Sequence, residues 1–254
     1  MPVKLINITN EGDFPKEIEK IVWAYLSALP EKIADTIRKT SIEHSIDVVC
    51  AVDQKLLCFE ELTNKVKDIL FNTNLVCYHA TKVLNLKDIT EQGLLRSAWS
   101  WYSFMLINNM KALNISEADI TKALSIVKIE QARKIGKVCF YVRDEQFIPK
   151  HGAGYYQFCE NIGGEIVRWS SLSQEMPEVY KKLKSNGQAI IVKVALPYED
   201  IACEVQARMA EQFIYYYIAK YFWDFEYEID FDCYTFKDIP VNNILEIISV
   251  MRID

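Results

Sequence analysis

Glycine and proline, the residues that most often interrupt helices and strands, are scarce in this chain. Only 8 of its 254 residues are glycine and 7 are proline, against average usages of about 7% and 5%. Glycine adopts backbone conformations that other residues resist, and proline lacks an amide donor, so both are concentrated in turns. We therefore expect long helices and strands joined by few loops.

The first part of the chain has a helical pattern. Between residues 15 and 45 apolar residues recur at steps of three and four, with a break at Pro30. The same spacing returns at Phe59, Leu62 and Val66, and it stops at the polar residues 72–74. These patterns predict a helical N-terminal extension over residues 1–73.

From residue 74 onward, strand and helix patterns are mixed. Short runs rich in β-branched and aromatic residues predict strands at 75–78, 138–142, 189–195 and 226–236. Helical spacing covers residues 86–92, 115–133 and 205–222. Because strands and helices do not alternate strictly, the pattern favours an α+β fold over a doubly wound sheet.

Composition and charge exclude several classes of protein. The chain is 50% hydrophobic and 25% charged, with a net charge of -6. These values are typical of a globular domain and not of a disordered chain. The acidic balance argues against an extended basic surface for nucleic acid, although a local basic patch remains compatible with it. The most apolar run, residues 212–223, is far shorter than the ~20 residues needed to span a bilayer, and the start does not resemble a signal peptide.

The seven cysteines are dispersed, without CxxC or CxxH spacing. Such a set is a poor disulfide framework and a poor zinc site. We expect reduced cysteines in the core of a cytoplasmic protein, and no metal. The common signatures of dinucleotide-binding, phosphate-loop, serine-hydrolase and zinc-protease sites are also missing from the sequence.

One short segment has a specific likeness. Residues 76–95 read VCYHATKVLNLKDITEQGLL: a strand that ends in Tyr78-His79-Ala80-Thr81, then a helix that ends in Gly93-Leu94. This order resembles the opening of the ADP-ribosyltransferase superfamily, in its group with a histidine in the first motif, which includes toxin-like members. By spacing alone, His79 is equally compatible with a structural histidine.

Later segments resemble the same superfamily in the same order. They are the strand at 138–142, the Gly-rich GAGYY at 152–156, the apolar IIVKVAL at 190–196 and the closing KDIPVNNI at 237–244. The resemblance implies an ADP-ribosyltransferase-like split β-sheet core, forming a catalytic domain over residues 74–254 behind the helical extension.

The resemblance also implies a substrate and residue roles. NAD would be the co-substrate, without a metal, and His79 would bind a ribose hydroxyl with support from Thr81. Tyr155 or Tyr156 would stack on the nicotinamide. Arg96 would grip the pyrophosphate, with Arg143 and Arg168 as further candidates, because guanidinium groups suit phosphate oxygens.

The catalytic carboxylate has two candidates. The family carries an acid on a late strand, where Glu228, Asp230 and Asp232 are spaced to share one face; Asp232 fits the position best. The rival is Glu165, which follows Gly163-Gly164 just beyond the two tyrosines. We prefer Glu165 and keep Asp232 as the alternative. If a residue of this pair is not catalytic, we expect it to be an ordinary solvated acid.

The function implied is NAD-dependent mono-ADP-ribosyl transfer by a toxin or phage-defence effector. Its partners would be a macromolecular acceptor, either protein or nucleic acid, and an antitoxin or regulatory protein. Two alternatives stay open: an NAD glycohydrolase, and a catalytically inactive binding module of the same fold. Transfer of an RNA 2′-phosphate to NAD is a weaker possibility, since that group's paired arginines and HxH element are not evident.

Overall fold

The computed structural model describes residues 3–52, 58–96, 98–131, 136–143 and 159–250. By its internal contacts the chain forms two compact units. The first contains Met1–Leu75 and Pro197–Asp232, and the second contains Val76–Leu196 and Cys233–Asp254. The chain passes from the first unit to the second within strand β2 (Thr73–Val83), returns at the end of β4 (Gln188–Pro197) and passes to the second unit again within β5 (Asp232–Thr235).

The first unit is helical apart from strand β1 (Lys4–Ile6), which pairs in parallel with the start of β2. Its other elements are η1 (Glu11–Asp13), α1 (Lys16–Ser27), α2 (Glu31–Arg38), α3 (Ser45–Ala51), α4 (Phe59–Leu70), η3 (Tyr198–Asp200) and α12 (Cys203–Trp223). The predicted break at Pro30 is confirmed, because Pro30 precedes the first residue of α2.

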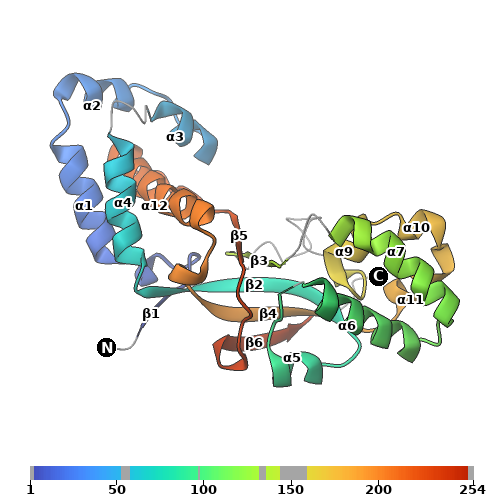
Figure 1. Ribbon diagram of the computed structural model, residues 1–254. Helices are drawn as coiled ribbons and strands as arrows, with labels where there is room; N and C mark the ends of the chain where they lie inside the picture. Colours follow the sequence, from blue (N-terminus) through green and yellow to red (C-terminus); the bar gives the residue numbers. More distant parts are fainter. Residues whose placement is uncertain (1–2, 53–57, 97, 132–135, 144–158, 251–254) are drawn as a thin grey trace. The chain divides into compact units, whose positions relative to one another are not determined.

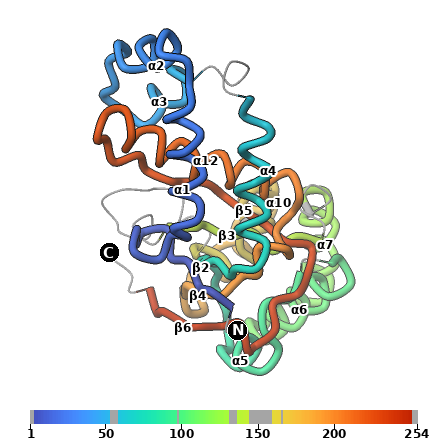
Figure 2. The backbone as a smooth tube through the Cα atoms, turned by 90° about the vertical axis from the view of Figure 1, so that its left-hand side faces the viewer, coloured from blue at the N-terminus to red at the C-terminus, as the bar shows by residue number. Residues whose placement is uncertain are grey.

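Helix α12 forms the centre of this first unit. Helices α1 and α4 lie along it (Figure 1, Figure 2), and Phe14 packs edge-on against Phe213 and Tyr216. The apolar residues of α12 are therefore buried within the unit. Residues 197–232, which we predicted to belong to the second domain, belong by their contacts to the first unit.

The second unit contains an open sheet with strand order β5-β3-β2-β4-β6. Pairing of β2 with β3 and of β4 with β6 is antiparallel, and the latter runs from Ile190 opposite Ser249 to Val194 opposite Ile244. The remaining strands are β3 (Val138–Tyr141), β4 (Gln188–Pro197), β5 (Asp232–Thr235) and β6 (Ile244–Ser249). The predicted α+β class is confirmed.

A helical group accompanies the sheet in this unit. It comprises α5 (Lys87–Gln92), α6 (Trp99–Ala112), α7 (Glu117–Gln131), α9 (Gly164–Trp169), α10 (Leu172–Glu175), α11 (Pro177–Ser185) and the short η4 (Val241–Asn243). Helices α6, α7, α9, α10 and α11 share an apolar core that includes Leu106, Met110, Val127, Val167 and Leu183. This core holds α9 in place.

Two expectations need correction. The strand predicted over 226–236 is regular only at Asp232–Thr235, although buried and exposed residues do alternate from Glu226 onward. The cysteines are not all core residues: Cys77, Cys159 and Cys233 are buried, but Cys50, Cys58, Cys139 and Cys203 are exposed. No helix in the described part of the chain combines the length and apolar character needed to cross a membrane.

Candidate functional site

The site is built on β2, whose two faces carry different side chains. Tyr78, Ala80 and Lys82 are buried on one face, at 1%, 8% and 5% exposure. His79 and Thr81 lie between them and are only half-buried. Successive side chains on a strand point to opposite faces, so His79 and Thr81 lie side by side on the second face.

The imidazole of His79 is fixed by the neighbouring strand. Its Nδ1 lies 2.9 Å from the main-chain oxygen of Cys139 on β3, and its ring meets Phe140 edge-on at 5.9 Å. A carbonyl oxygen can only accept, so Nδ1 carries the proton. In the neutral ring Nε2 is then the acceptor.

The segment after β2 meets the closing segment of the chain. Helix α5 ends at Gly93, whose φ of 79° and ψ of -159° favour glycine. The next residue, Leu94, forms an isolated antiparallel bridge with Ile239. The Gly93-Leu94 and Ile239-Pro240 segments, which are far apart in the sequence, are thus brought together.

Arg96 is engaged by the same closing segment. Its amide donates to Asp238 Oδ1 at 2.7 Å, its Nε lies 3.9 Å from the same oxygen, and its Nη1 donates to the carbonyl of Phe236 at 3.4 Å. The side chain is 53% exposed. A phosphate bound by Arg96 would share the guanidinium with Asp238.

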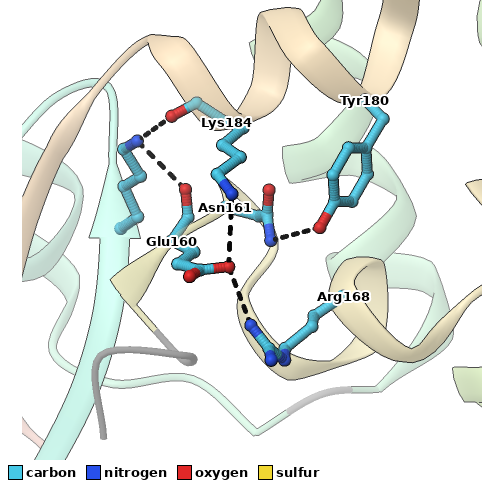
Figure 3. A network of polar contacts seen from close by, with 6 residues as sticks. Glu160, Asn161, Arg168, Tyr180 and Lys184 are labelled. Carbon is cyan, nitrogen blue, oxygen red and sulfur yellow. Dashed lines mark hydrogen bonds and ion pairs between the residues drawn. The ribbon is translucent and has the colours of Figure 1, made fainter. Parts of the chain in front are cut away.

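Arg168 and Lys184 surround the carboxylate of Glu160 (Figure 3). Arg168 Nη1 lies 2.7 Å from Glu160 Oε2 and Lys184 Nζ lies 3.7 Å from it. The guanidinium also lies 5.6 Å from the ring centre of Trp169. The structure therefore gives Arg168 an internal partner, Glu160.

Arg143, the third arginine candidate, is half-buried and lies two residues beyond the end of β3.

Next to Glu160, Asn161 is completely buried. Its Nδ2 donates to the hydroxyl of Tyr180 at 3.3 Å (Figure 3), while its Oδ1 has no partner among the described residues. A buried amide oxygen commonly binds an ordered water. Asn161 lies in the turn that leads into α9 and joins this turn to Tyr180 of α11.

The preferred carboxylate, Glu165, is the second residue of α9, and its side chain is outside the described part of the structure. The start of the helix is well defined. Gly163 has a φ of 90°, and the hydroxyl of Tyr102 donates to its carbonyl at 2.9 Å. Burial raises the pKa of Tyr102, which therefore remains a donor at any ordinary pH. The main chain around Glu165 is thus held by α6.

Asp232 is exposed and begins β5. The next residue, Cys233, points toward Cys77 of β2, with their sulfurs 3.8 Å apart, so strand alternation turns Asp232 to the opposite face of β5. Glu228 and Asp230 are also exposed, as expected for one face, but they precede the strand. The choice between Glu165 and Asp232 stays a prediction.

Tyr155 and Tyr156, the predicted nicotinamide-stacking residues, lie outside the described residues, as do Gly152 and Gly154. Within the described ranges, no group of three or more histidine, cysteine, aspartate or glutamate side chains is arranged to hold a metal ion. The structure adds a residue that was not predicted from the sequence, the buried Lys82. Its signal in the sequence is a lysine at an inward position of an apolar strand.

Comparison with known proteins adds no identification. No family model, no curated protein and no solved structure matches this chain.

Proposed function

We propose that the protein is an NAD-dependent mono-ADP-ribosyltransferase, an effector of the toxin or phage-defence kind that modifies a macromolecule. The observation that supports this most is the arrangement around β2. His79 and Thr81 share its half-buried face, α5 ends at Gly93, and Leu94 pairs with Ile239. Segments on which the resemblance to this superfamily rests, far apart in the chain, meet in one unit.

The proposed reaction breaks the bond between the nicotinamide nitrogen and the ribose carbon of NAD. The bonding electron pair leaves with nicotinamide, and positive charge develops on the ribose, as in glycoside hydrolysis. A nucleophilic atom of the acceptor then bonds to that carbon and loses its proton. The protein must hold the substrate in a reactive geometry and place a carboxylate against the developing charge.

His79 suits the binding role through its proton position. With Nδ1 donating to Cys139, the neutral ring presents Nε2 as an acceptor for a ribose hydroxyl. Thr81 on the same face supplies a hydroxyl beside it. Glu165 is our preferred carboxylate, because the backbone of α9 is fixed by the Tyr102–Gly163 bond; Asp232 is the alternative. Tyr155 or Tyr156 would stack on the nicotinamide, and Arg96 would contact the pyrophosphate.

The proposal is tested with NAD labelled on the adenylate phosphate, incubated with the protein in cell lysate and then treated with nuclease or protease. We expect the label to follow one polymer, which identifies the acceptor class as nucleic acid or protein. Release of nicotinamide without labelled polymer would instead assign glycohydrolase activity. If lysates that contain protein, RNA and DNA yield neither released nicotinamide nor labelled polymer, this result contradicts the proposal and favours a binding module.

A further inference from the structure

Lys82 is unusual in its position. Among the residues whose side chains the structure describes, a set that leaves out Glu165, it is the only lysine, arginine, aspartate or glutamate that is buried. An ammonium group removed from water is costly unless it is paired or hydrogen-bonded. Lys82 meets this need with main-chain oxygens: Nζ donates to the carbonyl of Glu160 at 3.1 Å and to the carbonyl of Lys184.

These two contacts join three segments of the second unit. Lys82 belongs to β2, Glu160 belongs to the turn before α9, and Lys184 lies in the last turn of α11. The ammonium is therefore a shared donor for two chain segments that lie 78 and 102 residues from it in sequence. An apolar side chain of the same length would fill the space but would leave the Glu160 carbonyl without this donor.

Glu160 carries the connection further. Its carbonyl accepts from Lys82, and its carboxylate pairs with Arg168 Nη1 at 2.7 Å (Figure 3). Because Arg168 lies near the end of α9, Glu160 ties that end of the helix to β2. The beginning of α9 is tied to α6 through the hydroxyl of Tyr102 and the carbonyl of Gly163. Helix α9 is thus held at both ends.

We infer that Lys82 is a positioning residue, which fixes α9, and with it Glu165, relative to the β2 face that carries His79 and Thr81. The catalytic consequence rests on the proposed function, whereas the structural consequence rests on the contacts alone. Lys82 itself points to the opposite face of β2 from His79, so its effect reaches the reaction through Glu160 and α9.

The test compares Lys82→Met, Lys82→Arg and a matched control, Lys182→Met, in the full chain. Lys182 Nζ also donates to two carbonyls, those of Leu113 and Asn114, but it is exposed. Nicotinamide release from NAD gives kcat and KM, and hydrogen exchange of residues 164–169 reports on α9 directly.

For Lys82→Met we expect kcat to fall on the order of 10- to 100-fold, since small displacements of reacting groups have effects of this size. KM for NAD should change by less than about threefold, because a misplaced carboxylate acts on the transition state more than on substrate binding. Exchange in α9 should accelerate. Lys82→Arg should recover part of the loss, and Lys182→Met should match the wild type.

A folded Lys82→Met protein with wild-type kcat and wild-type exchange in α9 would overturn the inference. If the wild type releases no nicotinamide, the proposed function fails, and exchange in α9 alone decides the role of Lys82: faster exchange supports it and unchanged exchange refutes it. Should Lys82→Met not fold, Glu160→Gln, which weakens the link to Arg168, carries the same prediction.

Discussion

Leu94 and Ile239 exchange two main-chain hydrogen bonds, although they lie near opposite ends of the second unit's sequence. The amide of Leu94 donates to the carbonyl of Ile239 at 3.0 Å, and the amide of Ile239 donates to the carbonyl of Leu94 at 2.8 Å. The bridge closes the unit beside the end of α5. It also sets the position of Arg96, which binds Asp238 one residue before Ile239.

Gly93 permits this close approach, so replacing it tests the arrangement. A Cβ at Gly93 would lie 2.0 Å from the carbonyl oxygen of Ile239, and its backbone has a φ of +79°. Strained backbone and overpacking each cost roughly 1–3 kcal/mol, so Gly93→Ala should lower the free energy of unfolding by about 2–6 kcal/mol.

Gly136 provides the matched control for Gly93. Its φ is +74°, yet a Cβ there would have nothing within 4 Å. Gly136→Ala should therefore show only the backbone cost, about 1–3 kcal/mol. Denaturant unfolding of both variants measures the difference. Equal losses would mean that the bridge between Leu94 and Ile239 does not crowd Gly93 in solution.

The two candidate carboxylates are separated by conservative variants. We expect Glu165→Gln to reduce nicotinamide release on the order of 100-fold, as removal of one electrostatic group in an active site does. Asp232→Asn should have a much smaller effect, because Asp232 is an exposed side chain turned away from Cys233. The reverse order of losses would assign the role to Asp232.

The cysteines should divide into two reactivity classes. Cys50, Cys58, Cys139 and Cys203 are exposed and should react quickly with a thiol reagent such as DTNB in the native protein. Burial raises the pKa of the Cys159 thiol to about 12, and Cys77 and Cys233 are also buried. These three should react only after unfolding, because the thiolate is the reactive form. A fifth fast thiol would contradict this assignment.

Glu211 of α12 should make stability depend on pH. Burial raises the pKa of its carboxyl, opposed by Arg208. A carboxyl with a raised pKa binds its proton more tightly in the folded state, so its contribution is greatest at low pH and is lost as pH rises through the folded pKa. Glu211→Gln should therefore raise Tm at pH 7 and leave it unchanged well below the ordinary pKa of 4.5.

Glu61→Gln is the control of opposite sign. A hydrogen bond from Lys65 lowers the pKa of the Glu61 carboxyl, so the carboxylate contributes stability above its ordinary pKa that is lost as pH falls through the folded value. This variant should lower Tm slightly at pH 7 and match the wild type at low pH. Two variants that shift Tm in the same direction at pH 7 would contradict the assignment.

Local patterns predicted the elements that carry their own periodicity. Helix α4 spans Phe59–Leu70 as the apolar spacing indicates, and α5 ends at Gly93 as predicted. Strand β2 begins at Thr73 and continues to Val83, so the predicted strand at 75–78 is its inner part. Because side chains alternate between the two faces of this strand, His79 is half-buried on one face and Lys82 is buried on the other.

Contacts between distant segments could not be predicted in the same way. The helices α9, α10 and α11 are short, and their burial depends on α6 and α7 rather than on a long apolar repeat. The partners of Lys82 come from two segments that have no pattern linking them to β2. The burial of α12 among N-terminal helices likewise depends on packing across most of the chain.

Nicotinamide release from NAD by His79→Ala is the decisive test of whether His79 belongs to an NAD site. His44→Asn is the matched histidine control, since His44 is exposed at the start of α3 in the first unit and asparagine keeps the capping role. We predict release by the wild type and by His44→Asn, and its loss in a folded His79→Ala protein. Normal turnover by His79→Ala would show that His79 does not belong to an NAD site.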